Sequence, residues 1–289
     1  MIEVKNLNYR YPKNQFDTIK GISFSVQKGE IFGFLGPSGA GKSTTQKILI
    51  RLLAAYSGNV LVSGRELKSS DSDYFNNIGV CFELPNHYLK LTALENLKFF
   101  SGFYKREPDN LNELLDKVGL AKDANTKVEN FSKGMKMRLN FIRSIMHNPD
   151  ILFLDEPTSG LDPVNARKIK DIILQQKQEG KTIFITTHNM FDADELCDRV
   201  SFIVDGRLEL TDSPRNIKQL GGKRLVRVEY DKDGIQSDEF PIEGLAENHK
   251  FIEVLKHNHI RSIHSKEATL DDIFIQVTGK KLVNHEGAF

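Results

Sequence analysis

The sequence predicts an α/β fold built on a parallel sheet with helices on both faces. Residues 151–154, 182–186 and 200–204 are short apolar segments, and a helical pattern at 164–178 separates the first two. Strands that are apolar throughout, joined by helices, are typical of parallel sheets buried on both sides. A further apolar strand, Ile31–Leu35, leads into a glycine-rich loop and a helix. This order of elements aims a helix N-terminus at an anion.

The loop fits the pattern G-x-x-x-x-G-K-[ST], in which backbone N–H groups cradle phosphate oxygens. Its members are Gly36, Pro37, Ser38, Gly39, Ala40, Gly41, Lys42, Ser43 and Thr44. Lys42 would place a positive charge on the β- and γ-phosphates, and the Ser43 hydroxyl could ligate Mg²⁺. The helix is expected to continue through the apolar positions Ile48, Leu49, Leu52 and Leu53.

Two carboxylates, Asp155 and Glu156, follow the strand at 151–154. Ligands of open α/β sheets bind at the carboxyl ends of the strands. Asp155 is therefore predicted to hold Mg²⁺, and Glu156, which points elsewhere, to polarise an attacking water. His188 follows the strand at 182–186. Its neutral imidazole could hydrogen-bond a γ-phosphate.

The remaining elements surround this core. Residues 1–30 are expected to form short strands and turns, 59–64 a hairpin edge and 78–82 a buried strand. Thr92 and Glu95 form a capping box that starts a helix. Leu111, Leu114, Leu115 and Val118 recur at helical spacing and predict a second helix, which Gly119 ends. A third helix is predicted at 137–146. Asp205-Gly206 predicts a hairpin turn.

Gly221-Gly222 is the predicted linker to a small mixed α/β tail. In that tail Val226, Val228 and Tyr230 alternate with charged residues, as in a half-buried strand. Thr269 and Asp272 frame the start of a helix with one apolar face. Nothing in the tail resembles a catalytic group.

Composition restricts the function further. The 289 residues have a net charge of +1, so no strong attraction to nucleic acid or anionic lipid is expected. The two cysteines, Cys81 and Cys197, are isolated and match no metal-site spacing, which favours a reduced, cytosolic chain. No apolar run approaches the about 20 residues of a membrane span, and no signal-peptide core is evident. Any membrane function is therefore expected to depend on a partner.

The order of these motifs resembles that of the ATP-binding cassette (ABC) ATPases, over residues 1 to about 215. The resemblance implies a P-loop NTPase (RecA-like) parallel core with an N-terminal antiparallel β subdomain and a helical subdomain at about 84–148. It also implies that ATP and Mg²⁺ are the cofactors. We expect a nucleotide-binding domain at 1–220 and a small C-terminal α/β extension at 221–289.

The resemblance also assigns residues. Phe131-Ser132-Lys133-Gly134-Met135 occupies the place of the family signature, usually LSGGQ. Ser132 and Gly134 would there grip the γ-phosphate bound on an opposite subunit. Ser159–Asp162 matches the loop that crosses the dimer interface. Tyr11 is placed like the aromatic residue that stacks on adenine, with Tyr9 as the rival.

The chain departs from the family pattern at two places. Lys133 replaces a glycine of the signature and adds a cation that could approach bound phosphate or remain solvated. Glu83 stands where the family normally has Gln, so a carboxylate is expected near Mg²⁺ and the attacking water. Residues 83–90, in transporters of the family, receive the coupling helix of the partner.

The resemblance implies an ATPase that works as a homodimer or heterodimer and drives a hydrophobic membrane permease. Such a subunit would lie in the cytoplasm, on the inner face of the membrane. Three features resemble the bacterial drug and antibiotic exporters: the signature spelling, the linker at Gly221 and the segment 267–274. The alternatives are a soluble ABC ATPase acting on ribosomes or DNA, and a catalytically weak half of a heterodimeric transporter.

Overall fold

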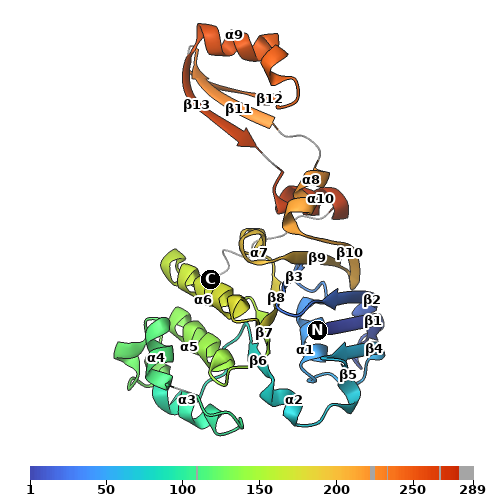
Figure 1. Cartoon of the computed structure of the whole chain (residues 1–289), viewed down its shortest axis with the longest axis vertical. Helices are drawn as coiled ribbons and strands as arrows, with labels where there is room; N and C mark the ends of the chain where they lie inside the picture. Colours follow the sequence, from blue (N-terminus) through green and yellow to red (C-terminus); the bar gives the residue numbers. More distant parts are fainter. Residues whose placement is uncertain (109, 222–224, 233, 267, 280–289) are drawn as a thin grey trace. The chain divides into compact units, whose positions relative to one another are not determined.

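A computed structural model describes residues 1–108, 110–221, 225–232, 234–266 and 268–279 (Figure 1). The chain divides into two compact units, one covering Met1–Ser213 and the other beginning at Pro214. Helix α8 (Pro214–Leu220) thus groups with the C-terminal unit, ahead of the predicted linker. The reason is close packing, because a Cβ at Gly221 would lie 2.5 Å from Cβ of Ala268 in the same unit. Gly222 of the predicted linker lies outside the described residues.

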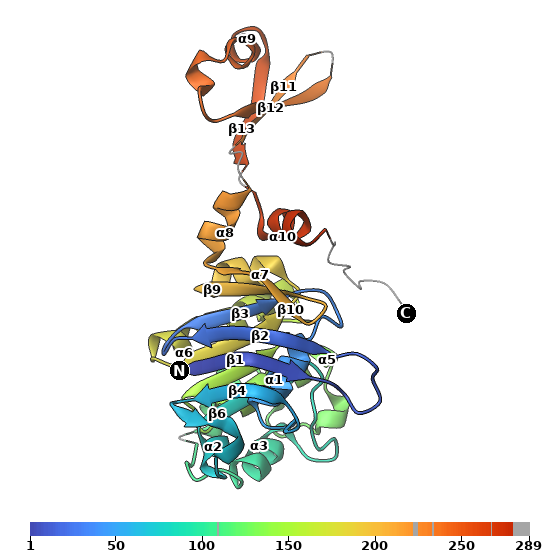
Figure 2. The same ribbon diagram turned by 90° about the vertical axis from the view of Figure 1, so that its right-hand side faces the viewer.

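The N-terminal unit begins with an antiparallel sheet of order β2-β1-β4-β5 (Figure 2). Its strands are β1 (Ile2–Tyr9), β2 (Ile19–Val26), β4 (Ser57–Val62) and β5 (Arg65–Glu66). Burial alternates along β1 and β2, as expected for a sheet with one face on the core. β4 and β5 form the predicted hairpin.

The second sheet of this unit has the order β10-β9-β3-β8-β7-β6. Its strands are β3 (Ile31–Leu35), β6 (Ile78–Cys81), β7 (Ile151–Asp155), β8 (Thr182–Thr187), β9 (Arg199–Val204) and β10 (Arg207–Asp212). β9, β3, β8, β7 and β6 are parallel, and β10 closes one edge as an antiparallel hairpin with β9. The predicted parallel α/β core is therefore confirmed.

Helices α5 and α6 lie on one side of this sheet, and the antiparallel sheet with α1 covers it on the other (Figure 1). The α-helices of the N-terminal unit are α1 (Lys42–Leu49), α2 (Asp73–Asn76), α3 (Ala93–Ser101), α4 (Leu111–Lys117), α5 (Lys133–Ile145), α6 (Pro163–Gln178) and α7 (Met190–Leu196). The capping box of Thr92 and Glu95 at the start of α3 is confirmed.

Two helix predictions were wrong in extent. α1 ends at Leu49 because Arg51 adopts a left-handed backbone with φ of 61°, and Leu52 is exposed. α5 begins at Lys133, a turn before the predicted Met137, because the Ser132 hydroxyl accepts a hydrogen bond from the Met135 N–H and so caps the helix.

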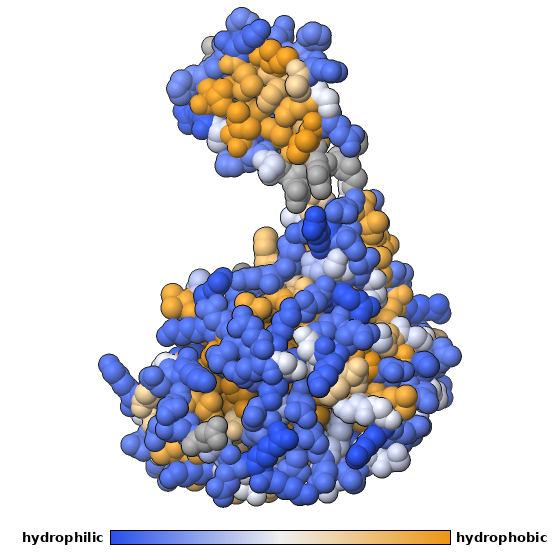
Figure 3. Space-filling view, viewed as in Figure 1, coloured by the Kyte–Doolittle hydropathy of each residue, from blue (hydrophilic) through white to orange (hydrophobic). Residues whose placement is uncertain are grey.

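The C-terminal unit contains a three-stranded antiparallel sheet of order β12-β11-β13. Its elements besides α8 are β11 (Leu225–Asp231), β12 (Ile235–Pro241), α9 (His249–His257), β13 (His259–Lys266) and α10 (Leu270–Thr278). Apolar side chains gather over this sheet on the face drawn in Figure 3. The strand through Val226 and the helix capped by Thr269 are as predicted, whereas β12, α9 and β13 were not foreseen.

Candidate nucleotide site

The phosphate loop follows β3, all of whose residues are buried, and ends at Gly41, the N-cap of α1. A Cβ at Gly36 would lie 2.1 Å from the carbonyl oxygen of Ile203 on β9, so only glycine fits there. Gly41 has φ of 114°, a conformation that glycine alone adopts readily. These two positions let the loop turn tightly between the strand end and the helix.

The Lys42 side chain folds back into the loop. Its ammonium donates to the carbonyl oxygens of Gly36, at 2.6 Å, and Pro37, at 3.0 Å. Burial lowers the pKa of Lys42, whereas the charges of Glu156, Asp155 and Glu83 raise it. The two carbonyl contacts therefore hold the cation inside the loop, where the charges of the three predicted carboxylates act on it.

Asp155 ends β7 and lies beside the phosphate loop. Its Oδ1 accepts a hydrogen bond from the Ser43 hydroxyl at 3.3 Å and a shorter one from Thr186 of β8. Burial raises the pKa of Asp155, and the hydrogen bonds from Thr186 and Ser43 lower it. The described residues contain no cluster of three or more His, Cys, Asp or Glu side chains able to hold a metal. Paired hydroxyl and carboxylate oxygens nevertheless fit Mg²⁺, which takes few protein ligands beside phosphates and water.

Glu156 is buried and has φ of 47°, an unusual conformation for a residue other than glycine. Its Oε1 accepts from the backbone N–H of His188 at 2.9 Å and lies 2.6 Å from His188 Nδ1. Its Oε2 accepts from the Thr187 hydroxyl at 2.9 Å. The hydrogen bond to Glu156 raises the pKa of His188 against the effect of burial. Glu156 and His188, the two residues predicted to be catalytic, are therefore hydrogen-bonded to each other.

Glu83 lies on the exposed loop that follows β6. Its charge contributes to raising the pKa of both Lys42 and His188, two residues of the predicted site. The backbone around it is fixed to α5, because Asn140 donates to the Phe82 carbonyl at 2.7 Å and Arg143 donates to the Asn86 carbonyl. These two hydrogen bonds from α5 were not predicted from the sequence.

Ser132 and Gly134 lie at the start of α5. In the described part of the chain, no hydrogen bond or ion pair connects either residue to the phosphate loop. Gly134 and the neighbouring Lys133 instead lie against the loop 159–162. A Cβ at Gly134 would lie 3.6 Å from Leu161 Cδ2, and one at Gly160 would lie 3.0 Å from Lys133 Cε. The Lys133 stem therefore runs along Gly160.

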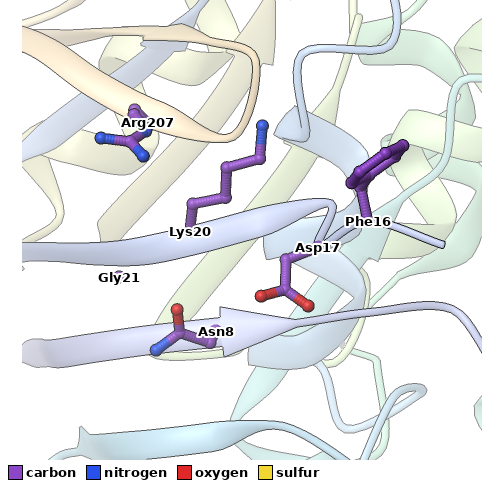
Figure 4. A pocket seen from close by; sticks show the side chains of 6 residues that line it. All are labelled: Asn8, Phe16, Asp17, Lys20, Gly21 and Arg207. Carbon is purple, nitrogen blue, oxygen red and sulfur yellow. The ribbon is translucent and has the colours of Figure 1, made fainter. Parts of the chain in front are cut away.

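Tyr11 lies at the other end of the phosphate loop. Its hydroxyl is 3.3 Å from Thr44 Oγ1, and its ring meets Tyr9 edge to face at 5.0 Å. Tyr9 is buried, whereas Tyr11 is half-buried. Tyr11 is thus the better placed of the two candidates to meet a base. A shallow groove elsewhere in this unit contains none of the predicted site residues (Figure 4); it is lined by Asn8, Phe16, Asp17, Lys20, Gly21 and Arg207.

Comparison with known proteins covers both units. Residues 19–159 match the family described as ABC transporter, and residues 224–267 match the fluoroquinolone efflux ABC transporter C-terminal domain. A fluoroquinolones export ATP-binding protein of Mycobacterium tuberculosis is 55% identical over 284 residues, which are 98% of this chain and 94% of the relative. The linearmycin resistance ATP-binding protein of Bacillus subtilis is 31% identical, covering 98% of this chain and 99% of the relative.

Solved structures agree with these relatives. A structure of the ATP-binding subunit of an ABC transporter has a TM-score of 0.70 at 28% identity, over 77% of this chain and 93% of the other. A dimeric ATP-binding cassette in a post-hydrolysis state, bound to ADP and phosphate, has a TM-score of 0.67 at 27% identity, over 74% of this chain and 98% of the other. No helix in the described residues is both long and apolar enough to span a bilayer.

Proposed function

This chain belongs to the ATP-binding proteins of ABC transporters, a family of ATPases, and from that premise we propose that it powers the export of a fluoroquinolone or similar small drug. One observation supports ATP hydrolysis as the energy source of this export. The ends of β3, β7 and β8 bring Lys42, Asp155 and the Glu156–His188 pair to one edge of the sheet. The similarity to the fluoroquinolones export protein extends through the C-terminal unit, which supports the drug class. Neither alternative function is favoured by these relatives.

In the proposed mechanism the phosphate loop and Lys42 bind the ATP phosphates, and Tyr11 stacks on adenine. Ser43 and Asp155 would hold Mg²⁺, with Glu83 near it; the metal neutralises phosphate charge when bound. Glu156 orients and deprotonates the attacking water, and His188 contacts the γ-phosphate. Ser132 and Gly134 would complete the site of a second cassette. All these residues lie within Met1–Ser213, the unit to which we assign nucleotide binding, and we assign the unit that begins at Pro214 as an extension.

A membrane permease is the proposed partner, reached at the inner face of the membrane. The described surface of the helical subdomain exposes a cluster of apolar side chains, namely Leu84, Tyr88, Leu89, Phe99 and Phe103. The rings of Phe99 and Tyr88 are in contact at 4.7 Å, and those of Phe99 and Phe103 at 5.3 Å. Exposed apolar patches of this kind favour protein contacts. Leu84 directly follows Glu83 in the chain, so a permease bound here would lie next to a residue of the proposed nucleotide site.

The proposal predicts that cells without this chain accumulate the drug. Removing this chain from its host should raise the uptake of a fluorescent fluoroquinolone, because export would lack its energy source. The parent chain should restore low uptake, and the Glu156→Gln variant, expressed at the same level, should not. Equal accumulation in all three strains would exclude fluoroquinolones as the cargo.

Lys42→Ala should weaken ATP binding by about 10-fold or more, because a charge-assisted contact to phosphate is lost. Fluorescence titration with a labelled ATP analogue measures this. Lys47→Ala is the matched control, since Lys47 lies on the same helix but is exposed. Equal affinities for Lys42→Ala and the parent would contradict the assignment of Lys42.

Glu83→Gln should weaken the apparent Mg²⁺ affinity several-fold while ATPase activity is retained. A carboxylate is a stronger magnesium ligand than an amide of the same length. Mg²⁺ titrations of nucleotide binding and of ATPase activity give the comparison, with Glu209→Gln on the exposed face of β10 as the control. Superimposable curves would place metal sensing elsewhere.

A further inference from the structure

Consecutive threonines at the end of β8 meet the two consecutive carboxylates at the end of β7. The strands are parallel, and Asp155 pairs with Thr186 in their register. Neighbouring side chains on a strand point to opposite faces. Thr186 accordingly bonds to Asp155, and Thr187 donates to Glu156 Oε2 at 2.9 Å. Each carboxylate therefore has its own hydroxyl partner.

The proton of the Thr187 hydroxyl has a defined direction. Thr187 is 2% exposed, so protein groups rather than bulk water surround it. Its oxygen accepts a hydrogen bond from the backbone N–H of Asn189 at 3.0 Å. A hydroxyl has one proton to donate, and the carboxylate of Glu156 is the acceptor within reach. Because the Asn189 N–H occupies an acceptor position of the Thr187 oxygen, the hydroxyl proton of Thr187 is directed to Glu156.

The two carboxylate oxygens of Glu156 accept hydrogen bonds from different residues. Oε1 receives both bonds from His188, whereas Oε2 is bonded to Thr187. Without Thr187 the carboxylate would be held only through Oε1. It could then turn about the Cγ–Cδ bond, and the fixed orientation of the water-activating group would be lost. Misplacement of a catalytic group by about 1 Å can cost on the order of 100-fold in rate.

We propose that Thr187 is a positioning residue. It fixes the orientation of Glu156, which in turn orients and deprotonates the water that attacks the γ-phosphate. The inference rests on the role proposed for Glu156. It separates Thr187 from Thr186, whose hydroxyl serves the metal-binding carboxylate and lies 3.1 Å from Gln46 Oε1. Thr187 acts through Glu156 and need not touch the nucleotide.

Thr187→Val removes the hydroxyl while keeping the shape of the side chain. We expect kcat for ATP hydrolysis to fall about 10-fold, the scale of a lost hydrogen bond to a charged group. KM for ATP should stay within about two-fold of the parent value, because the phosphate loop is unchanged. Thr187→Ser restores the hydroxyl and should recover most of the rate. Thr187→Ala, with the same expected loss, replaces the valine variant if the latter does not fold.

Thr182→Val is the matched control. Thr182 is a buried threonine on the same strand, and its hydroxyl bonds to the Gly29 N–H far from the carboxylates. This variant should lose stability, measured by thermal unfolding, without a selective loss of kcat. An equal fall in kcat for Thr182→Val, or no rescue by serine, would overturn the positioning role.

A double variant tests whether Thr187 acts through Glu156. Single-turnover hydrolysis by Thr187→Val/Glu156→Gln should equal that of Glu156→Gln alone, because effects transmitted through one group are not additive. A further multiplicative fall would mean that Thr187 acts independently and would overturn the inference. Near-normal turnover of Glu156→Gln alone would instead refute the proposed role of Glu156 and this inference with it.

Discussion

Glu156→Gln is expected to reduce steady-state ATP turnover by about 100-fold or more, the scale of lost general-base catalysis, while ATP binding is retained. The amide has the length of the carboxylate but cannot accept the proton of the attacking water. Lys42 and the phosphate loop are untouched, so nucleotide affinity should match that of the parent. ATP would then remain bound, and the variant should accumulate as an ATP-bound dimer.

Steady-state ATPase assays and size-exclusion chromatography with ATP measure the two effects separately. Glu179→Gln, at the exposed C-terminal end of α6, provides the same chemical change away from the site. It should behave as the parent in both assays. Near-normal turnover of Glu156→Gln would remove Glu156 from the role of base.

The predicted features that proved correct are those whose signals are contiguous in sequence. The strand, glycine loop and helix at 31–49 follow one another directly, and so do the apolar strand and the carboxylates at 151–156. The capping box of Thr92 requires only residues three apart. Local hydrogen bonding and burial determine these elements, so one stretch of sequence is sufficient to predict them.

The missed features depend on contacts between distant segments. The hydrogen bond from Thr187 to Glu156 needs β8 to lie beside β7, and the contact of Thr186 with Gln46 spans 140 positions. Thr186 and Thr187 directly precede His188 in the sequence, but only the order of the strands in the sheet gives each threonine its carboxylate partner. The end of α1 was missed for a different reason, because the left-handed backbone of Arg51 has no signal in its residue type. Sequence order alone leaves these pairings undetermined.

Mixing Ser132→Arg chains with Lys42→Ala chains should restore ATPase activity that neither variant has alone. Ser132 is exposed at the start of α5, and it has no bond to the phosphate loop among the described residues. If it completes the site of a partner, each homodimer has two damaged sites. A mixed dimer collects both lesions in one site and leaves the other intact. Random pairing would then recover about a quarter of the parent activity in a symmetric two-site dimer.

The control mixes Lys42→Ala with Glu156→Gln, two residues that the structure places in the same half-site. Each chain of that mixed dimer damages a different site, so activity should stay low. Native mass spectrometry of chains with different tags establishes that mixed dimers form in both experiments. Recovery with Ser132→Arg but not with Glu156→Gln means that the signature acts on the opposite subunit. If neither mixture recovers activity although mixed dimers are present, either Ser132 acts within its own chain or the two sites hydrolyse ATP only together.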